Sequence, residues 1–357
     1  MFDVALVNRT PFSAATHVQV DRDGQEMLLA VMCATFQAAS DDAPLTLAEV
    51  QAPVRDLDLP RGDPTRSSIA FETDLAPLKP RVDVLVHGHA TVPRGGSTGE
   101  LEVALRIADI DKRLKVTGDR AGPRDAPRPF SRLPLVYERA FGGSAPDGDC
   151  CRENPVGIGH RGASSADPAV ASAMPNIAYA DPRAASASNP GGPALPAGFG
   201  IVARQWLPRL PLAGTYDQHW LDTVWPLPPD DFDPLFHQTA PRDQQTARIV
   251  GGETVELVHM TPSGLWRFRL PVLDVPVHLI HADQVRQTRW AVDTVEIDAD
   301  RRQVTLKARQ AIRVPRQSPP LECVVLGPVT PAWLRARQQR KVWRPRAGAT
   351  PPPCFHP

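Results

Sequence analysis

The chain has 357 residues, of which 40 are proline, and its 40 basic residues balance its 40 acidic residues, so the formal net charge is +0. An interior proline removes a hydrogen bond and clashes with the preceding helical turn, so this composition excludes a mostly helical protein. The balanced charge excludes a global attraction to nucleic acid or to anionic lipid. Because 42% of the residues are hydrophobic, the chain can still bury a core.

The first predicted domain, residues 1–118, contains patterns typical of strands. Residues 101–107 place Leu, Val, Leu and Ile on one face and Glu and Arg on the other, as in a half-buried strand. Residues 82–86 alternate less cleanly, which is typical of a strand covered on both faces. A short turn at 109–111 leads into residues 113–117, so we expect a hairpin there.

Residues 27–36 form the longest apolar run of the chain. The run is too short to cross a bilayer. Its pattern fits a helix or a buried strand, but Val31, Cys33, Thr35 and Phe36 favour the strand.

The second predicted region, residues 119–241, holds 19 of the 40 prolines. It is also rich in Gly and in aromatic residues, which need a surface to pack against. We therefore predict long ordered loops, with few short helices, packed on β blocks. The aromatic residues either hold these loops on the sheets or form a surface that binds a partner. The residues considered for this surface are Trp206, Arg209, Tyr216, Trp220, Trp225 and Phe232.

The third predicted domain, residues 242–315, repeats the hairpin pattern. Residues 253–260 and 265–270 flank a turn-rich loop, and so do residues 290–297 and 304–309. The fold class predicted from these patterns is mainly β, with antiparallel sandwich-like blocks or one large β structure.

The last predicted region, residues 316–357, is a basic, proline-rich tail without an acidic residue after Glu322. Residues 331–342 fit a short basic helix. The tail is interpreted either as a solvated, partly disordered terminus or as an arm that docks on an acidic partner.

The sequence predicts a cytoplasmic protein. Its N-terminus lacks the basic and then apolar pattern of a signal peptide. Five cysteines without CxxC spacing are typical of reduced thiols. They are Cys33, Cys150, Cys151, Cys323 and Cys354.

Chemical motifs are scarce. The chain has no GxSxG, Walker A, HExxH or GxGxxG motif. His87 and His89 lie on one face of a predicted strand, where they either share a metal ion or bond to neighbouring groups. From the residues alone we expect no enzyme, cofactor or metal site.

A carboxylate cluster follows Pro228 and Pro229. Asp230, Asp231 and Asp233 either divide acid and base roles or cap a helix that starts near Pro234, and capping is the simpler interpretation.

Several strings of residues resemble a known family. They are, in chain order, Asn8–Phe12, Leu78–Val86, Val116–Arg120, Leu135–Gly143, Asn154–Gly159, Met174–Ile177, Pro196–Gly200, Trp206–Arg209, Gly214–Asp217, Pro228–Asp233 and Ala240–Gln244. The order of these strings, from about residue 5 to residue 315, resembles domain-of-unknown-function family 2169, which is associated with bacterial type VI secretion.

The resemblance implies a non-enzymatic adaptor or chaperone that helps load an effector onto the type VI secretion spike. Its expected partners are an effector, a spike protein or both, with no nucleic acid and no membrane. The strings imply a set of structural motif residues. These are Lys79, Asp83, Asp119, Arg120, Tyr137, Glu138, Arg139, Phe141, Gly142, Gly143, Asn154, Pro155, Gly157, Asp231, Asp243 and Gln244.

Two positions depart from the family strings. Val82 stands where threonine is typical, and Ala178 stands where glutamate is typical. The missing carboxylate favours a structural or binding role. The alternatives are a metal-assisted hydrolase that uses His87, His89 and the Asp230–Asp233 cluster, and a secreted component of the spike.

Overall fold

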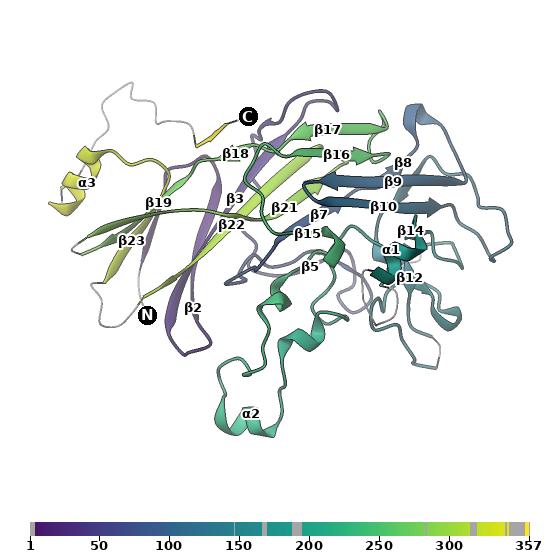
Figure 1. The fold of residues 1–357 in the computed structure, drawn as a ribbon, viewed down its shortest axis with the longest axis horizontal. Helices are drawn as coiled ribbons and strands as arrows, with labels where there is room; N and C mark the ends of the chain where they lie inside the picture. Colours follow the sequence, from purple (N-terminus) through teal and green to yellow (C-terminus); the bar gives the residue numbers. More distant parts are fainter. Residues whose placement is uncertain are drawn as a thin grey trace.

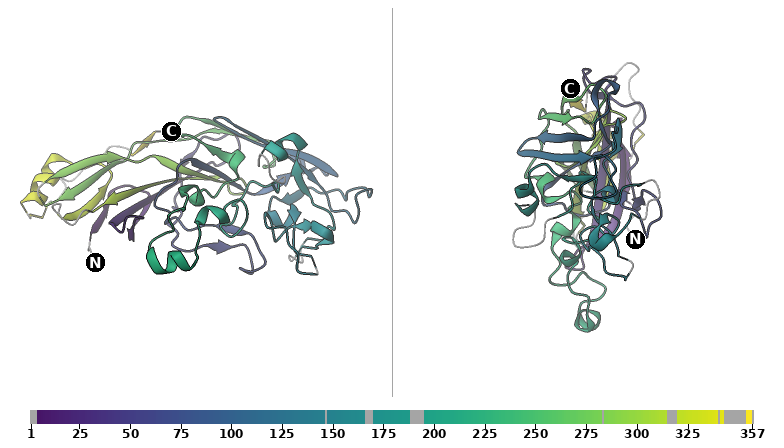
Figure 2. Two further views of the ribbon diagram at one scale, coloured as in Figure 1. Left: turned by 60° about the horizontal axis from the view of Figure 1, so that its bottom comes forward. Right: turned by 90° about the vertical axis from the view of Figure 1, so that its right-hand side faces the viewer.

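The computed structural model describes residues 4–145, 147–165, 170–187, 195–282, 284–314, 320–339, 341–342 and 354–356. This part of the chain is mainly β, with several antiparallel sheets, long loops and short helices, as predicted. The molecule is elongated, and a loop segment projects from its middle (Figure 1 and Figure 2). None of the described helices is both long and apolar enough to span a membrane.

The largest sheet contains seven strands. Its order is β15 (Gln245–Thr246), β7 (Val82–His87), β21 (Val292–Asp298), β22 (Gln303–Arg313), β3 (Glu26–Gln37) and β2 (Ser13–Val20), and β4 (Thr46–Leu47) pairs with β3. Strands β7 and β21 are parallel, whereas β21 and β22 form the predicted antiparallel hairpin. The apolar run 27–36 is confirmed as a strand, because it lies inside β3.

A five-stranded sheet contains the other two predicted hairpins. Its order is β14 (Ile177–Tyr179), β10 (Ile110–Thr117), β9 (Glu100–Ile107), β16 (Thr254–Val258) and β17 (Leu265–Arg269). Strand β9 pairs with β16, so a strand from residues 1–118 joins one from residues 242–315. The seven-stranded sheet likewise contains strands from both ranges, since β7 lies between β15 and β21, and β22 pairs with β3. The two ranges therefore build shared sheets, which is the single large β structure that the sequence left open.

A four-stranded sheet lies at one end of the molecule (Figure 1). Its order is β1 (Ala5–Asn8), β23 (Leu321–Leu326), β19 (Pro276–His281) and β20 (Val285–Arg289). Strand β23 lies in the range 316–357 that the sequence assigns to a tail, yet four of its side chains, residues 323–326, are fully buried. Helix α3 (Pro331–Gln338) follows it, within the segment that fits a basic helix. Residues 343–353 of the tail lie outside the described residues.

The remaining elements are short. Two-stranded ladders join β5 (Leu59–Pro60) to β6 (Ile69–Phe71), β8 (His89–Thr91) to β11 (Arg132–Pro134), β12 (Phe141–Gly142) to β13 (Ile158–Gly159), and β18 (Val272–Leu273) to β24 (Phe355–His356). The other helices are α1 (Pro182–Ala187), α2 (Gln218–Thr223), η1 (Pro93–Gly95), η2 (Tyr137–Arg139), η3 (His160–Gly162), η4 (Leu210–Ala213), η5 (Pro234–His237) and η6 (Arg242–Gln244).

The seven-stranded sheet has an apolar face and a polar face, because successive side chains of a strand point to opposite sides. On the apolar side, Val84 and Val86 of β7 and Leu306 of β22 share one core with Leu105 of β9 and Trp266 of β17. On the polar side, Asp83, His87, Glu296 and Lys307 are also buried. This polar face and the loops that cover it are the setting of the site described next.

Candidate functional site

Lys307 is the centre of one buried ionic cluster on the polar face. Its Nζ lies 2.9 Å from a carboxylate oxygen of Asp74 and 2.9 Å from one of Glu296. Burial alone would raise the pKa of Glu296, but Lys307 and Arg55 outweigh it and lower this pKa from 4.5 to about 2. Glu296 therefore stays ionised at neutral pH. Because Asp74 lies outside the sheet, these ion pairs hold its loop against β21 and β22.

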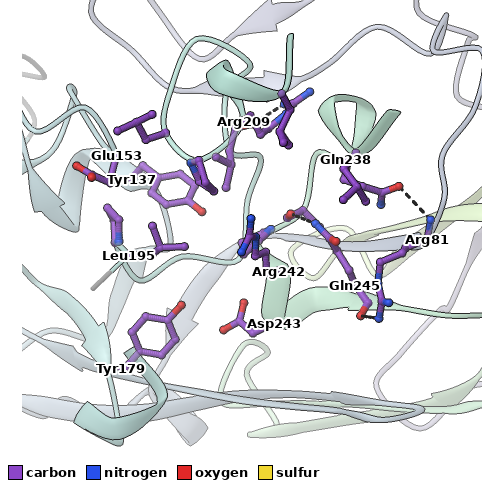
Figure 3. Close-up of a pocket in the computed structure, with 18 residues that line it drawn as sticks. Arg81, Tyr137, Glu153, Tyr179, Leu195, Arg209, Gln238, Arg242, Asp243 and Gln245 are labelled. Atoms are coloured by element: carbon purple, nitrogen blue, oxygen red, sulfur yellow. Dashed lines mark hydrogen bonds between the residues drawn. The ribbon is translucent and has the colours of Figure 1, made fainter. Parts of the chain in front are cut away.

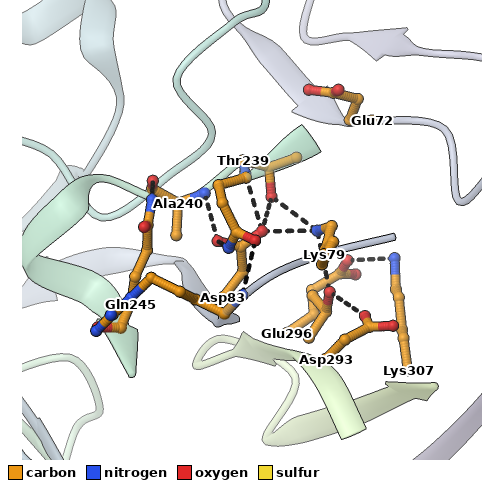
Figure 4. A network of polar contacts seen from close by, with 12 residues as sticks. Glu72, Lys79, Asp83, Thr239, Ala240, Gln245, Asp293, Glu296 and Lys307 are labelled. Atoms are coloured by element: carbon orange, nitrogen blue, oxygen red, sulfur yellow. Dashed lines mark hydrogen bonds and ion pairs between the residues drawn. The ribbon is translucent and has the colours of Figure 1, made fainter. Parts of the chain in front are cut away.

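Asp83 is the centre of a second cluster (Figure 4). One of its carboxylate oxygens accepts a hydrogen bond from Lys79 Nζ at 2.6 Å and another from the Thr239 backbone N–H at 2.8 Å. The other oxygen accepts from Gln238 Nε2 at 2.8 Å and from the Ala240 N–H at 3.2 Å. The carboxylate is fully buried and fully paired, so its role here is to fix residues 238–240 on β7.

Arg209 forms a third buried pair. Its two terminal nitrogens lie 2.7 Å and 2.8 Å from the two carboxylate oxygens of Glu72, and it also donates to the Phe236 carbonyl. Trp206 is 2% exposed and packs edge-to-face on Tyr137, with the ring centres 5.4 Å apart. Two of the six residues considered for a partner surface, Arg209 and Trp206, therefore lie in the interior and hold loops in place.

The Tyr137–Arg139 turn connects three segments. Glu138 accepts hydrogen bonds from the Ser68 backbone N–H at 2.7 Å and from its hydroxyl at 2.9 Å. Arg139 Nη1 lies 3.0 Å from Asp119 and 3.1 Å from the side-chain oxygen of Asn176. The buried side chains of Glu138 and Arg139 thus bond to neighbouring loops and hold them in place.

Close backbone packing continues at Gly142 and Gly143. Both have positive φ angles, 149° and 102°. A Cβ at Gly142 would overlap the Asn154 carbonyl oxygen, and one at Gly143 would overlap the Gly157 carbonyl oxygen. Asn154 is fully buried and donates to the Phe141 carbonyl at 3.0 Å. Glycine is therefore required at both positions.

Lys112 fastens η6 to the five-stranded sheet. Its buried Nζ lies 2.8 Å from Asp243, 2.8 Å from Gln244 and 2.6 Å from the Gly198 carbonyl. Gln244 in turn donates to the Val84 carbonyl of β7 at 2.7 Å. This contact set links both large sheets through the string Ala240–Gln244.

The histidines and aspartates of the alternative hydrolase have separate structural contacts. His87 is buried with Nδ1 3.3 Å from Arg61, whereas His89 lies 2.8 Å from Asp300. Asp233 accepts a hydrogen bond from the Leu235 N–H and caps η5, as predicted. Across the residues that the structure describes, no three His, Cys, Asp or Glu side chains gather into a group able to hold a metal ion.

A cavity of about 290 Å³ lies where several of the family-like strings meet (Figure 3). Its lining includes Tyr137, Pro196, Leu207, Arg209 and Arg242, which come from four different strings. Most of the other lining side chains are apolar. The cavity was not predicted, because the strings that form its walls are far apart in the sequence.

Residues 210–235, here named the aromatic arm, project from the middle of the molecule and carry α2 near their outer end (Figure 1). Three large apolar side chains on it are more than half exposed: Tyr216 at 58%, Leu221 at 52% and Trp225 at 64%. The predicted partner residues Tyr216 and Trp225 are thus on the surface. Leu221 was not among the predicted residues.

The aromatic arm is held by its own contacts. Asp217 caps α2 by accepting a hydrogen bond from the Trp220 N–H, and Trp220 Nε1 donates to the Leu227 carbonyl at 2.9 Å. Asp231 accepts from both the N–H and the hydroxyl of Thr215. Phe232 packs on Phe236 and His237. These contacts fix the arm while its outer apolar side chains face solvent.

Comparison with known proteins gives one match. The sequence model of a family described as "Uncharacterized protein conserved in bacteria (DUF2169)" matches residues 23–309, which is more than half of the chain. Neither a curated protein nor a solved structure matches the chain. The family resemblance drawn from the ordered strings is therefore confirmed, and the chain belongs to the bacterial DUF2169 family.

Proposed function

We propose that this protein is a non-enzymatic, cytoplasmic adaptor that binds a type VI secretion effector and helps to load it onto the spike. The observation that carries the proposal is the exposure of Tyr216, Leu221 and Trp225 on the projecting aromatic arm. Aromatic residues are enriched at the centres of protein interfaces. Several large apolar side chains exposed on one projecting segment favour a protein-binding surface.

The ionic clusters support the non-enzymatic part of the proposal. Lys307, Asp83 and Arg209 are each buried and paired with groups of the protein itself. Such groups stabilise one arrangement of loops and sheets. The aromatic arm therefore starts from a body with fixed loops, which lowers the entropy lost when a partner binds.

The thiols support the cytoplasmic part. All five cysteines are free, and burial raises the pKa of the Cys33 thiol to about 12. A thiol with so high a pKa is a poor nucleophile. Unreactive, unpaired thiols are typical of a reducing compartment.

The test is affinity capture of the tagged protein with the products of its neighbouring genes. The wild-type protein is expected to recover an effector, a spike protein or both. The triple variant Tyr216→Ala, Leu221→Ala, Trp225→Ala is expected to recover at least about tenfold less, because the substitutions remove the exposed apolar contacts. Its melting temperature is expected to stay within a few degrees of wild type, since the three side chains are exposed.

The matched control is the double variant Val50→Ala, Leu57→Ala, which removes apolar side chains that are 76% and 71% exposed outside the arm. It is expected to keep wild-type recovery. Equal recovery by the arm variant would show that partners bind elsewhere. Recovery of neither an effector nor a spike protein by the wild type would count against the adaptor itself. Release of the protein into the culture medium by an intact secretion system would instead identify a secreted component.

A further inference from the structure

The cavity beside η6 contains an arginine, Arg242, that has no bonding partner in the part of the chain that the structure describes. Arg81, Arg209 and Asp243 also line this cavity, but they bond to the Gln245 carbonyl, to Glu72 and to Lys112. Arg242 is exposed, and its guanidinium makes no hydrogen bond or ion pair with any residue in the described ranges. It is therefore available to an anionic group that enters the cavity.

A tyrosine ring forms part of the wall of the same cavity. Tyr137 is 4% exposed, and its hydroxyl has no hydrogen-bond partner among the described residues. Figure 3 shows the hydroxyl end of this ring directed toward Arg242. Burial raises the pKa of Tyr137 well above 10, so the hydroxyl stays neutral. Because its oxygen has less than 1 Å² of accessible surface, a ligand in the cavity meets the ring of Tyr137 and not its hydroxyl.

The ring of Tyr137 packs directly on the backbone at Gly198. A Cβ at position 198 would come within 2.7 Å of the Tyr137 ring, so only Gly198 leaves room. The same segment gives its carbonyl to Lys112. The position of the ring is thus fixed by its packing on Gly198 and on Trp206.

The size and walls of the cavity limit what can enter. Its volume of about 290 Å³ is at the lower end of the range for small-molecule sites, so it holds one compact group. Leu207, Pro208, Leu212 and Leu235 supply apolar wall, and Tyr179 supplies a second ring. Glu153 also lines the cavity and accepts a hydrogen bond from the Cys151 thiol. The matching ligand is apolar over most of its surface and has one acidic end.

We propose that this cavity binds a compact apolar carboxylate, with its acidic end on Arg242 and its body between Tyr137 and Leu207. The inference does not rest on the adaptor proposal. The same chemistry has two sources: a free aromatic or short aliphatic acid, and the C-terminal residue of a polypeptide with an apolar side chain.

The experiment measures binding by calorimetry to the full chain. The probes are 3-phenylpropionate and its neutral amide, and a pentapeptide that ends in phenylalanine, prepared with a free carboxylate and with a C-terminal amide. Each acid that binds is expected to bind at least about tenfold more tightly than its amide, since an arginine–carboxylate contact contributes this much. Binding of 3-phenylpropionate alone assigns the cavity to a free acid. Tighter binding of the peptide acid assigns it to a polypeptide terminus.

Variants locate the binding. Arg242→Gln is expected to weaken binding of the acid about tenfold and to leave the amide unchanged. Tyr137→Phe keeps the ring and removes only the buried hydroxyl, so it is expected to bind the acid like wild type. Arg248→Gln, at an exposed arginine outside the cavity lining, is the control and is expected to bind like wild type. Arg242→Gln removes no hydrogen bond or ion pair within the described ranges, so its melting temperature is expected to match wild type.

The proposal is overturned if neither acid binds below about 10 mM, or if acid and amide bind equally. It is also overturned if Arg242→Gln binds the acids like wild type. These outcomes are separate from the capture experiment, because the variants of the aromatic arm leave Tyr137 and Arg242 in place.

Discussion

Replacement of Lys307 by methionine is expected to lower the free energy of unfolding by about 3–5 kcal/mol. The lysine is 4% exposed and is paired with Asp74 and Glu296, which are 3% and 9% exposed. Methionine fills a similar volume but leaves two carboxylates close together without this cation. Urea denaturation followed by tryptophan fluorescence measures the change as a lower midpoint.

The control is Arg289→Gln. It breaks the pair between Arg289 and Asp274, whose atoms lie 3.9 Å apart and whose side chains are 78% and 52% exposed. Solvent screens such a pair, so we expect a change within about 1 kcal/mol. A loss of less than about 1 kcal/mol for Lys307→Met would show that water or rearranged partners replace the lysine.

The stability of the protein is expected to fall as the pH decreases from about 6.5 to about 4, and His87 is one cause. Burial lowers the pKa of His87 from 6.5 to about 4. In this pH window the unfolded chain binds a proton that the folded protein does not, so acid favours unfolding. Above pH 6.5 both states are neutral and the effect vanishes. The full loss for this residue is about 3 kcal/mol.

His87→Gln tests this prediction. Unfolding midpoints in urea are measured at several pH values between 7.5 and 4.5 for the variant and for wild type. The variant is expected to lose less stability over this range, although His237, whose pKa burial also lowers to about 4, keeps part of the effect. His219→Gln, at an exposed histidine of α2, is the control. Parallel pH profiles for His87→Gln and wild type would contradict the assignment.

The carboxylate Glu296 acts in a lower pH window. Its folded pKa of about 2 is below the unfolded value of 4.5. Its contribution is therefore fully present above pH 4.5 and is lost as the pH falls toward 2. The loss above pH 4.5 in the His87 experiment is thus separate from protonation of Glu296.

Local sequence patterns predicted individual strands and hairpins. They did not predict contacts between residues far apart in the sequence. The hairpin of β9 and β10 follows from alternation within residues 100–117. By contrast, Lys307 and Asp74 are 233 positions apart, and no spacing rule connects them. Strand β23 was missed because the proline-rich, basic composition around it is typical of a tail.

The candidate site could be predicted only in part, because local composition shows which residue types are present but not how they pack. The aromatic residues considered for a partner surface include the exposed rings of Tyr216 and Trp225, but composition does not tell an exposed ring from a buried one such as Trp206. The cavity needed the fold, since Tyr137 and Arg242 come from separate strings that meet only in three dimensions.

The pairing of strands from the two ends of the chain has a consequence for biosynthesis. Thr35 of β3 and Thr305 of β22 bond to each other across 270 positions. Nearly the whole chain must therefore leave the ribosome before β22 can pair with β3. Until then, one apolar edge of β3 is unpaired. Proteins with such high contact order fold slowly and expose aggregation-prone strands on the way. Truncated versions that stop before β22 are accordingly expected to collect in the insoluble fraction, so interaction studies need the full chain.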